Sequence, residues 1–184
     1  MGNLLRHGRR ALVQYFSLTP PTTDTRVNVQ IATFRPIHAR AFETLNRAWL
    51  VEHGLLEPRD EQHLADPWGR IVAPGGQIFV ATRGDKVVGT CAIVPEGTDT
   101  YELVKLTVAA SARGHGIGRR LVEACLAFAG GRGGRRVVLL SNSRLVTAIR
   151  LYESLGFRHR PLPPDVKYAT ADVYMEYTCE APAA

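Results

Sequence analysis

Cysteine is scarce in this chain of 184 residues, which contains only Cys91, Cys125 and Cys179. Three cysteines at such wide spacing do not make a disulfide framework or the usual ligand set of a metal site. Long hydrophobic runs are also missing, because no apolar stretch approaches the roughly 20 residues that a helix needs to cross a bilayer. These absences favour a globular protein of a reducing compartment, so we expect a cytoplasmic location, no membrane partner and no bound metal.

Acidic residues are fewer than basic residues. The chain has 17 Asp and Glu against 23 Lys and Arg, which gives a formal net charge of +6. A basic balance can indicate a nucleic-acid partner. No recognised nucleic-acid motif accompanies the charge, however, and a small ligand that carries several phosphates explains it at least as well. We therefore expect no nucleic-acid partner and look for a phosphate site.

The length of the chain suits one domain, since a domain typically takes roughly 100–200 residues. Residues 1–26 are predicted to form an N-terminal extension and linker, and residues 27–180 to form the domain. The extension begins with basic residues, and Pro20 and Pro21 in the linker cannot continue a helix. A solvated tail is the main interpretation of this extension, with a docking or dimer arm as the alternative.

A strand, a tight turn and a helix are predicted in succession in the middle of the chain. Residues 104–108 alternate between apolar and polar side chains, which is the period of a half-buried strand. The apolar members are Val104, Leu106 and Val108, and the polar members are Lys105 and Thr107. From Ile117 onward, apolar residues recur at helical spacing with arginines on the other face.

The turn between them, Arg113-Gly-His-Gly-Ile-Gly118, has the chemistry of an anion site. The first turn of a helix leaves its N–H groups unpaired, and the helix dipole makes that end positive. Glycine lets a phosphate approach the backbone closely, and Arg113, Arg119 and Arg120 add positive charge. The spacing fits neither the dinucleotide fingerprint nor a P-loop, so a different pyrophosphate ligand is indicated.

This turn closely resembles the acetyl-CoA signature of the GNAT superfamily of N-acetyltransferases. Upstream, Tyr101–Val108 is similar to the fourth strand of that family. Downstream, Ala148–Phe157 resembles its Leu-Tyr-x-x-x-Gly-Phe motif. Two motifs in the right order and at the right separation are far more specific than a glycine turn alone. The resemblance covers about residues 29–177.

The resemblance implies a mixed α/β fold with a central, mostly antiparallel twisted sheet. About six to seven strands are expected, splayed between the fourth and fifth, with about four flanking helices. Periodicity and turn residues place the strands at residues 27–34, 77–82, 86–94, 101–108, 137–140, from 157, and 171–178. The helices are expected to run from Pro36 to Glu52, through residues 58–64, from Ile117 to about Gly130, and from Val146 to Leu155. Asp66–Gly69 is expected to be a turn.

The activity implied by the resemblance is transfer of an acetyl group from acetyl-CoA to a primary amine. The transfer is expected to be direct, in a ternary complex without an acyl-enzyme. The acceptor is a small-molecule amine or a protein amino group, and a homodimer is compatible with the family. The alternative is a non-catalytic domain that binds acetyl-CoA as a sensor or regulator.

The resemblance also assigns residues to the donor. Leu106, Thr107 and Val108 are expected to pair with the pantetheine arm as an added strand does. The family often has an asparagine where this chain has Leu145, so Asn142 or Ser143 is the candidate substitute. The diphosphate is expected to bind Arg113, Gly114, His115, Gly116, Ile117, Gly118 and Arg119, with His115 exposed and not catalytic.

Two further side chains match positions with roles in proton transfer. Glu102 is the candidate base for the acceptor amine; the alternatives are a structural strand residue, with water as the base. Tyr152 is the candidate donor to the leaving thiolate, and the alternative is a packed tyrosine. The acceptor is expected near the loop His53–Glu61, whose polar residues are either site residues or a solvated connection. These are His53, Glu57, Asp60 and Glu61, and Tyr168 either closes the pocket or packs in the core.

Overall fold

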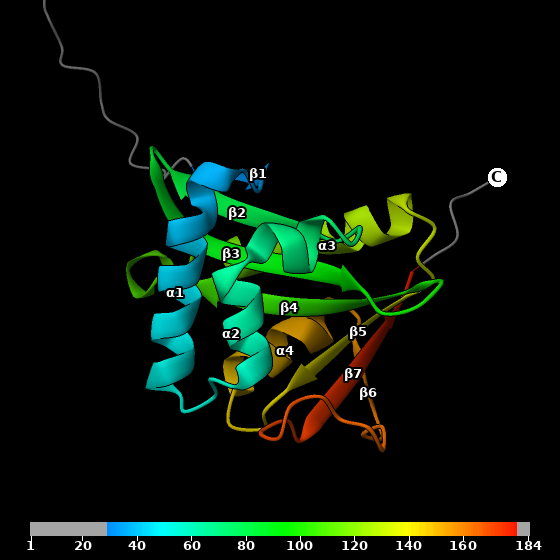
Figure 1. Cartoon of the computed structure of the whole chain (residues 1–184). Coiled ribbons are helices and arrows are strands. Elements are labelled where there is room, and N and C mark those ends of the chain that lie inside the picture. The colour runs from blue at the N-terminus through cyan, green and yellow to red at the C-terminus, as the bar shows by residue number, and fades with distance from the viewer. Residues whose placement is uncertain (1–28, 180–184) are drawn as a thin grey trace, which may run out of the picture.

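A seven-stranded sheet with helices on both faces forms the body of the protein (Figure 1). The structure is a computed structural model that describes residues 29–179. The predicted extension, residues 1–26, lies outside the described residues, so the proposed domain boundary stays a prediction. The mixed α/β class, the strand number and the four main helices that the sequence predicts are confirmed.

The strand order is β1-β2-β3-β4-β5-β7-β6, and every neighbouring pair is antiparallel except β4 and β5. The parallel pair is short, because only Thr100–Glu102 of β4 pairs with Arg136–Val138 of β5. Beyond these residues the two strands separate, as the sequence predicts. The strands are β1 (Val29–Thr33), β2 (Gln77–Arg83), β3 (Lys86–Pro95), β4 (Thr100–Val108), β5 (Arg136–Ser141), β6 (Arg158–Arg160) and β7 (Val173–Thr178).

The helices cover both faces of this sheet, with α1 and α2 on the near face in Figure 1 and α3 and α4 behind. Their bounds are α1 (Ala39–Glu52), α2 (Pro58–Ala65), α3 (Ile117–Gly131) and α4 (Val146–Ser154). Short helical turns are η1 (Pro36–His38), η2 (Trp68–Val72) and η3 (Ala110–Ala112). Within residues 29–179, no helix combines the length and apolar character needed to cross a membrane.

Two of the predicted boundaries need correction. The helix predicted from Pro36 begins as the separate 3₁₀ turn η1, and α1 proper starts at Ala39. The turn predicted at Asp66–Gly69 leads into η2, a π-helical turn in which the Ala73 N–H donates to the Trp68 carbonyl at 2.8 Å. Asp66 supports its start, because its carboxylate accepts from the Gly69 N–H at 2.8 Å.

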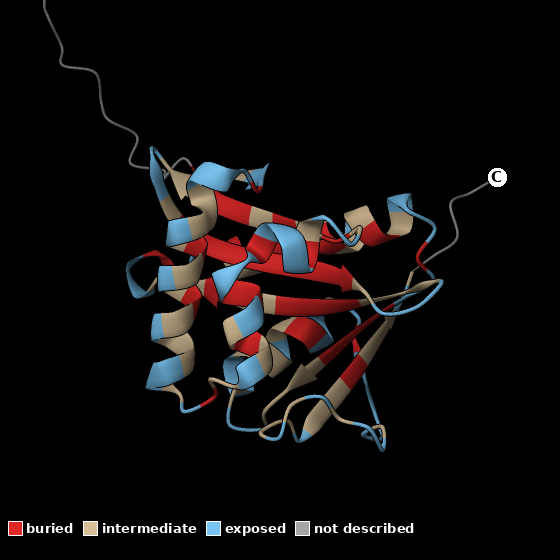
Figure 2. Ribbon diagram, in the orientation of Figure 1, coloured by how far each residue is buried: buried red, intermediate tan, exposed pale blue. Residues whose placement is uncertain are grey.

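The two faces of the sheet carry separate hydrophobic cores. The larger core lies between the sheet and the rear helices and includes Leu121, Cys125 and Leu139. The smaller core lies under α1 and α2 and includes Phe42, Leu64 and Val104. Figure 2 shows buried positions along β2, β3 and β4 at the centre of the sheet, which both cores share. The site described next lies where these central strands give way to β5.

A β-bulge in β4 changes the predicted face of one side chain. Thr90 of β3 stands opposite Thr107, whereas Ala92 stands opposite Val104, so β4 carries an extra residue in between. Lys105 adopts a left-handed backbone conformation there, with φ of 57°. Val104 therefore joins the core under α1 and α2, while Leu106 and Val108 pack on the opposite core. The strict alternation that residues 104–108 predict is wrong at Val104.

Candidate active site

A cleft opens where β4 leaves β5. Its volume is about 140 Å³, enough for several atoms of a ligand, since one water needs only about 10–15 Å³ on this scale. The front helices contribute Asn46, Trp49 and Asp60 to its wall, and α4 contributes Tyr152. Strand β4 contributes a continuous run from Glu102 to Thr107. The cleft therefore exposes one edge of β4, unpaired beyond Glu102, to side chains from both helical layers.

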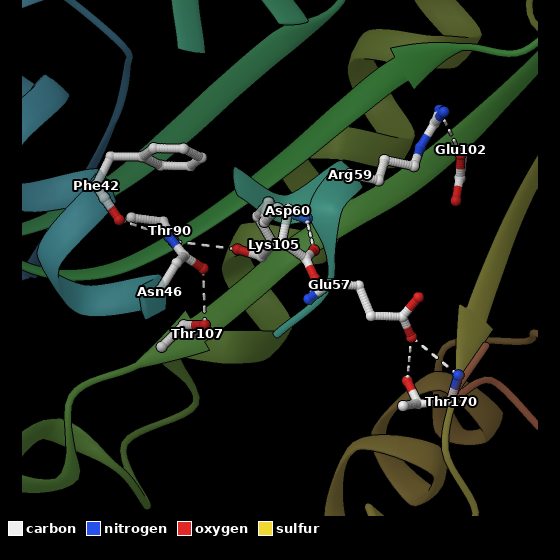
Figure 3. Close-up of polar contacts among 10 residues, drawn as sticks. All are labelled: Phe42, Asn46, Glu57, Arg59, Asp60, Thr90, Glu102, Lys105, Thr107 and Thr170. Carbon is white, nitrogen blue, oxygen red and sulfur yellow. Dashed lines mark hydrogen bonds and ion pairs between the residues drawn. The ribbon is translucent and has the colours of Figure 1, made fainter. Parts of the chain in front are cut away.

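A buried hydrogen-bond network holds the bulge of β4 against α1 (Figure 3). Asn46 donates to the Thr90 hydroxyl at 2.9 Å and to the Phe42 carbonyl at 2.8 Å. Thr90 donates in turn to the Lys105 carbonyl at 3.0 Å, and Thr107 donates to the Asn46 side-chain oxygen at 2.8 Å. Because each buried polar atom finds a partner, the network fixes the backbone at the bulge instead of destabilising the core.

Lys105 turns its ammonium inward from the bulge to Asp60 of α2, at 2.5 Å. The two side chains are only 4% and 3% exposed, although the Lys105 residue as a whole is half-buried. Its exposed surface therefore belongs mainly to the main chain, which faces the cleft. Burial lowers the pKa of Lys105, and the Asp60 carboxylate opposes that shift. Asp60 also accepts from the Glu57 N–H at 2.9 Å and so caps its own helix.

Glu102 is the buried carboxylate of the cleft. It is 3% exposed, and neither carboxylate oxygen has a hydrogen-bond partner among the described residues. Arg59 approaches it at 3.8 Å from α2, which is too long for a direct hydrogen bond. Burial raises the pKa of Glu102, while the positive charges of Lys167, Arg59 and Lys105 lower it. The carboxylate of Glu102 therefore holds a proton more tightly than an exposed glutamate does.

Tyr152 reaches the opposite wall of the cleft from α4. It is 7% exposed, and its ring packs against Phe157 with centroids 5.7 Å apart. Burial raises the pKa of its hydroxyl, and the neighbouring Cys91 and Cys125 thiols add to the effect. The hydroxyl therefore keeps its proton at neutral pH and can donate a hydrogen bond into the cleft.

The glycine turn at the start of α3 presents an uncapped helix end. Gly116 is the N-cap, with φ of 70°, and no side chain caps the first turn. The first N–H groups of α3 are therefore free to bind an anion, which fits a pyrophosphate.

Contacts on either side hold the start of α3 in place. Gly118 lets α3 approach α4, because a Cβ there would lie 3.3 Å from Leu151 Cδ2. Arg119 donates to the Ser154 hydroxyl at 2.7 Å, and Arg113 donates to the Val108 carbonyl at 3.1 Å.

A clasp ties the start of α2 to the segment between β6 and β7. The Glu57 carboxylate accepts from the N–H groups of Ala169 and Thr170, both at 2.9 Å, and from the Thr170 hydroxyl at 2.7 Å. Burial alone would raise the pKa of Glu57, but the hydrogen bonds from Thr170 and Ala169 hold it below its usual value. Asn142 completes the clasp by donating to the Thr170 carbonyl at 2.6 Å.

The structure brings five of the predicted site residues to the wall of one cleft: Glu102, Leu106, Thr107, Asn142 and Tyr152. Asn142 is already engaged, because its oxygen accepts from the Arg144 N–H and Nε. His115 is exposed as predicted, with its ring Nδ1 2.8 Å from the Arg113 carbonyl. Val108 and the turn lie beyond the cleft.

The predicted acceptor loop divides between two roles. Asp60 lines the cleft and Glu57 holds the clasp. Glu61 instead pairs with Arg47 at 2.6 Å, and His53 stacks on Trp49 with ring centroids 4.3 Å apart. Tyr168 lines the cleft with a buried hydroxyl that has no partner among the described residues. Sequence reasoning missed Asn46 and Lys105. Asn46 could have been found, because it follows Phe42 by four positions on the predicted helix. Residues at that spacing share a face, so a polar side chain was to be expected on the buried side.

Comparisons with known proteins show what the chain and its fold resemble. A family described as an acetyltransferase (GNAT) domain matches residues 74–159. The mycothiol acetyltransferase of Acidothermus cellulolyticus is 34% identical over 82% of this chain and 52% of its own length. Among solved structures, a GNAT-family acetyltransferase of Staphylococcus aureus matches with a TM-score of 0.75 and 16% identity, over 83% of this chain and 99% of its own.

A second solved structure is similar to this chain and contains the donor. It is yncA of Salmonella typhimurium with its cofactor acetyl-CoA, with a TM-score of 0.69 and 20% identity over 85% of this chain and 96% of its own. At such identities the solved structures support the shared fold. The chain spans about half the length of the curated relatives it matches.

Proposed function

This chain belongs to the GNAT superfamily of acetyltransferases, and on that premise we propose that it transfers an acetyl group from acetyl-CoA to a primary amine. The transfer is direct, in a ternary complex without a covalent enzyme intermediate. One observation supports the proposal: the cleft between β4 and β5 contains a buried carboxylate, Glu102, that has no hydrogen-bond partner within residues 29–179, and a phenol, Tyr152, whose raised pKa keeps it protonated.

The residues present suit the donor. The uncapped N–H groups at the start of α3, with Arg113 and Arg119 beside them, offer a site for the diphosphate. The part of β4 that has left β5, Leu106 to Val108, stays paired with β3 but offers its other edge to the amides of the pantetheine arm. When bound, acetyl-CoA supplies the thioester. Exposed main chain at the bulge of β4 then offers an N–H to the thioester oxygen, where negative charge develops.

The chain's own residues supply the proton transfers. Glu102 accepts the proton that an alkylammonium acceptor must lose before its nitrogen can attack the thioester carbon. The raised pKa of Glu102 suits this role, because a stronger base takes the proton more readily. Tyr152 donates its O–H to the sulfur as the carbon–sulfur bond breaks, so that the charge of the leaving thiolate is stabilised.

The proposal is tested by measuring thiol release from acetyl-CoA by the purified chain with a panel of amines, amino acids and peptides. We expect turnover with at least one primary amine and none with the corresponding tertiary amine, which cannot yield a stable amide. Calorimetric binding of acetyl-CoA should be measured alongside. Binding of acetyl-CoA without turnover of any amine would overturn the catalytic proposal and favour a sensor domain.

The donor site is tested separately by Gly116→Asp. The new carboxylate would occupy the free amides of α3 and repel the diphosphate, so we expect acetyl-CoA affinity to fall by about 100-fold or more. Gly84→Asp is the matched control, because Gly84 also has a positive φ and open space around it but lies in the β2–β3 turn. Equal affinities of the two variants would contradict the assignment of the diphosphate to α3.

A further inference from the structure

A second cleft, of about 180 Å³, lies beneath the segment that joins β6 to β7. Residues 163–167 of that segment cover it, and β4 and β5 form its floor. Its wall shares Glu102 and Leu140 with the first cleft. One carboxylate therefore borders both spaces, the one where acetyl transfer is proposed and the one beside it.

The charges that line the second cleft do not balance. Glu96, Glu102 and Asp165 contribute three carboxylates, and Lys167 contributes the one ammonium. Lys167 is paired with Glu96, so its charge is already neutralised. Asp165 has no ion-pair partner within residues 29–179, and Glu102 has only the long contact to Arg59. Arg59 compensates Glu102 and Lys167 compensates Glu96, so the uncompensated charge of this lining is the negative charge of Asp165.

The buried Glu102 and the half-buried Tyr174 both border this cleft. Glu102 is 3% exposed and its oxygens have no hydrogen-bond partner among the described residues, so its carboxylate is left for a ligand to satisfy. Tyr174 lines the same cleft, and its pKa is raised first by burial and then by the carboxylates of Glu176, Glu102 and Glu96, against Arg136. The apolar remainder of the wall, Val138 and Leu140, suits a methylene chain.

We propose that the second cleft binds the tail of the acceptor and selects a second cationic group, so that the acceptor is a linear diamine or polyamine. This inference rests on the proposed acetyl transfer. The reacting amine lies in the first cleft beside Glu102. The methylene chain crosses Val138 and Leu140, and the distal ammonium lies near Asp165. Glu102 takes the proton of the reacting amine, while the distal amine keeps its own.

The experiment compares three four-carbon acceptors that differ only at the far end: putrescine, butylamine and γ-aminobutyrate. Rates of thiol release give kcat/KM for each. We expect putrescine to exceed butylamine by about tenfold, and γ-aminobutyrate to be the poorest because its carboxylate meets Glu96 and Asp165. Equal values for the three acceptors, or a preference for γ-aminobutyrate, would overturn the tail site while leaving the acetyltransferase proposal intact.

Two variants that change the charge of the second cleft in opposite directions test the electrostatic explanation. Asp165→Asn should lower the ratio of putrescine to butylamine by about three- to tenfold. Lys167→Met should raise it a few-fold, because it removes the one ammonium of the cleft. The matched control is Asp85→Asn in the β2–β3 turn, which should leave the ratio unchanged. A shift of the ratio in the same direction for Asp165→Asn and Lys167→Met would refute an electrostatic tail site.

Binding provides a readout that does not depend on turnover. Calorimetry with spermidine on the full chain should detect binding that weakens as salt is added and that Asp165→Asn reduces. If no amine is acetylated but spermidine binds in this way, the proposed function fails and the cationic site stands. If neither putrescine nor spermidine binds, the tail site fails whatever the assay with other amines shows.

Discussion

The two faces of the sheet differ in chemistry although the same strands build both. The rear face, under α3 and α4, buries an almost wholly apolar core around Leu121 and Cys125. The front face, under α1 and α2, holds every buried polar or charged residue of the described part of the chain. These are Asn46, Asp60, His63, Thr90, Glu102 and Thr107.

The two faces therefore contribute differently to the stability of the fold. Burying apolar surface stabilises the rear face by about 25 cal/mol per Å². Burying the Glu102 carboxylate, which has no hydrogen-bond partner within residues 29–179, costs free energy, and such a cost is typical of functional sites. Changes to the buried polar residues of the front face should therefore alter activity or the balance of buried charge, while changes to the apolar rear core away from Tyr152 should alter stability alone.

The largest effect is expected at Glu102 itself. Glu102→Gln removes the base but keeps the shape, so kcat/KM for amines should fall by about 10²–10⁴-fold. The free energy of unfolding at neutral pH should stay equal or rise, because a buried charge has been removed. Urea titration and steady-state rates check the two effects, with the exposed Glu52→Gln of α1 as control. Unchanged rates would identify Glu102 as structural and water as the base.

The buried ion pair should behave differently from either of its members. Asp60→Leu leaves the Lys105 ammonium buried and unpaired, so the free energy of unfolding should fall by about 3–5 kcal/mol. The double change Asp60→Leu with Lys105→Met should recover most of the loss, except about 1 kcal/mol for the lost helix cap. Urea titration measures both. A double variant as unstable as the single one would contradict this account.

A core substitution on the rear face should show the opposite pattern. Leu121 is fully buried and packs against β3, where a Cβ on Gly89 would lie 3.1 Å from its Cδ1. Leu121→Ala should lower the free energy of unfolding by about 2–5 kcal/mol. The rate per folded molecule should stay near wild type. Val51→Ala, at a position 60% exposed, is the control, and a loss of stability of the same size there would invalidate the contrast.

The smallest effect concerns pH and the buried His63. Burial, followed by the charges of Lys105, Arg59 and Arg70, lowers its pKa to about 3. In the unfolded chain His63 is protonated as the pH falls through about 6.5, whereas in the folded chain it stays neutral. The free energy of unfolding therefore decreases as the pH falls. His63→Leu should therefore gain about 1–2 kcal/mol relative to wild type between about pH 7 and about pH 5. Urea titration at both pH values measures the gain.

The measured quantity is the difference in the free energy of unfolding between His63→Leu and wild type, so the contributions of all other titrating groups cancel. Glu102 acts in the opposite sense, because its raised pKa makes the folded chain bind the proton more tightly than the unfolded chain. That contribution is present in both proteins and cancels. A stability difference between the two proteins that does not change with pH would contradict a buried neutral histidine.

Most of the fold was predictable because its signals are local. The glycines around α3, the apolar run of β5 and the tyrosine of α4 each mark an element within a few residues of sequence. Glu102 and Tyr152 were predicted through motifs that surround them, and the structure brings both to one cleft. Their catalytic roles stay predictions.

The interior of the front face was not predictable in the same way. Period-two alternation assigns Val104 and Lys105 to opposite faces, but the bulge brings both to the front. A bulge can be recognised only when the two paired strands are aligned with each other. The local pattern of residues 104–108 does not indicate it. Asp60 stood among the candidates, but its partner lies 45 residues later and depends on that bulge.

The clasp at Glu57 has a consequence for the order in which the chain is made. Its hydrogen-bond donors, Ala169 and Thr170, are 112 and 113 residues further along, so they leave the ribosome long after α2. The donor turn at Gly116 is synthesised well before them. A nascent chain that ends within α4 therefore already has the glycine turn that we propose binds acetyl-CoA, but it lacks Thr170 and Ala171 of the cleft wall. The cleft in which we propose that the amine binds is therefore complete only after residues 169–171 have been synthesised.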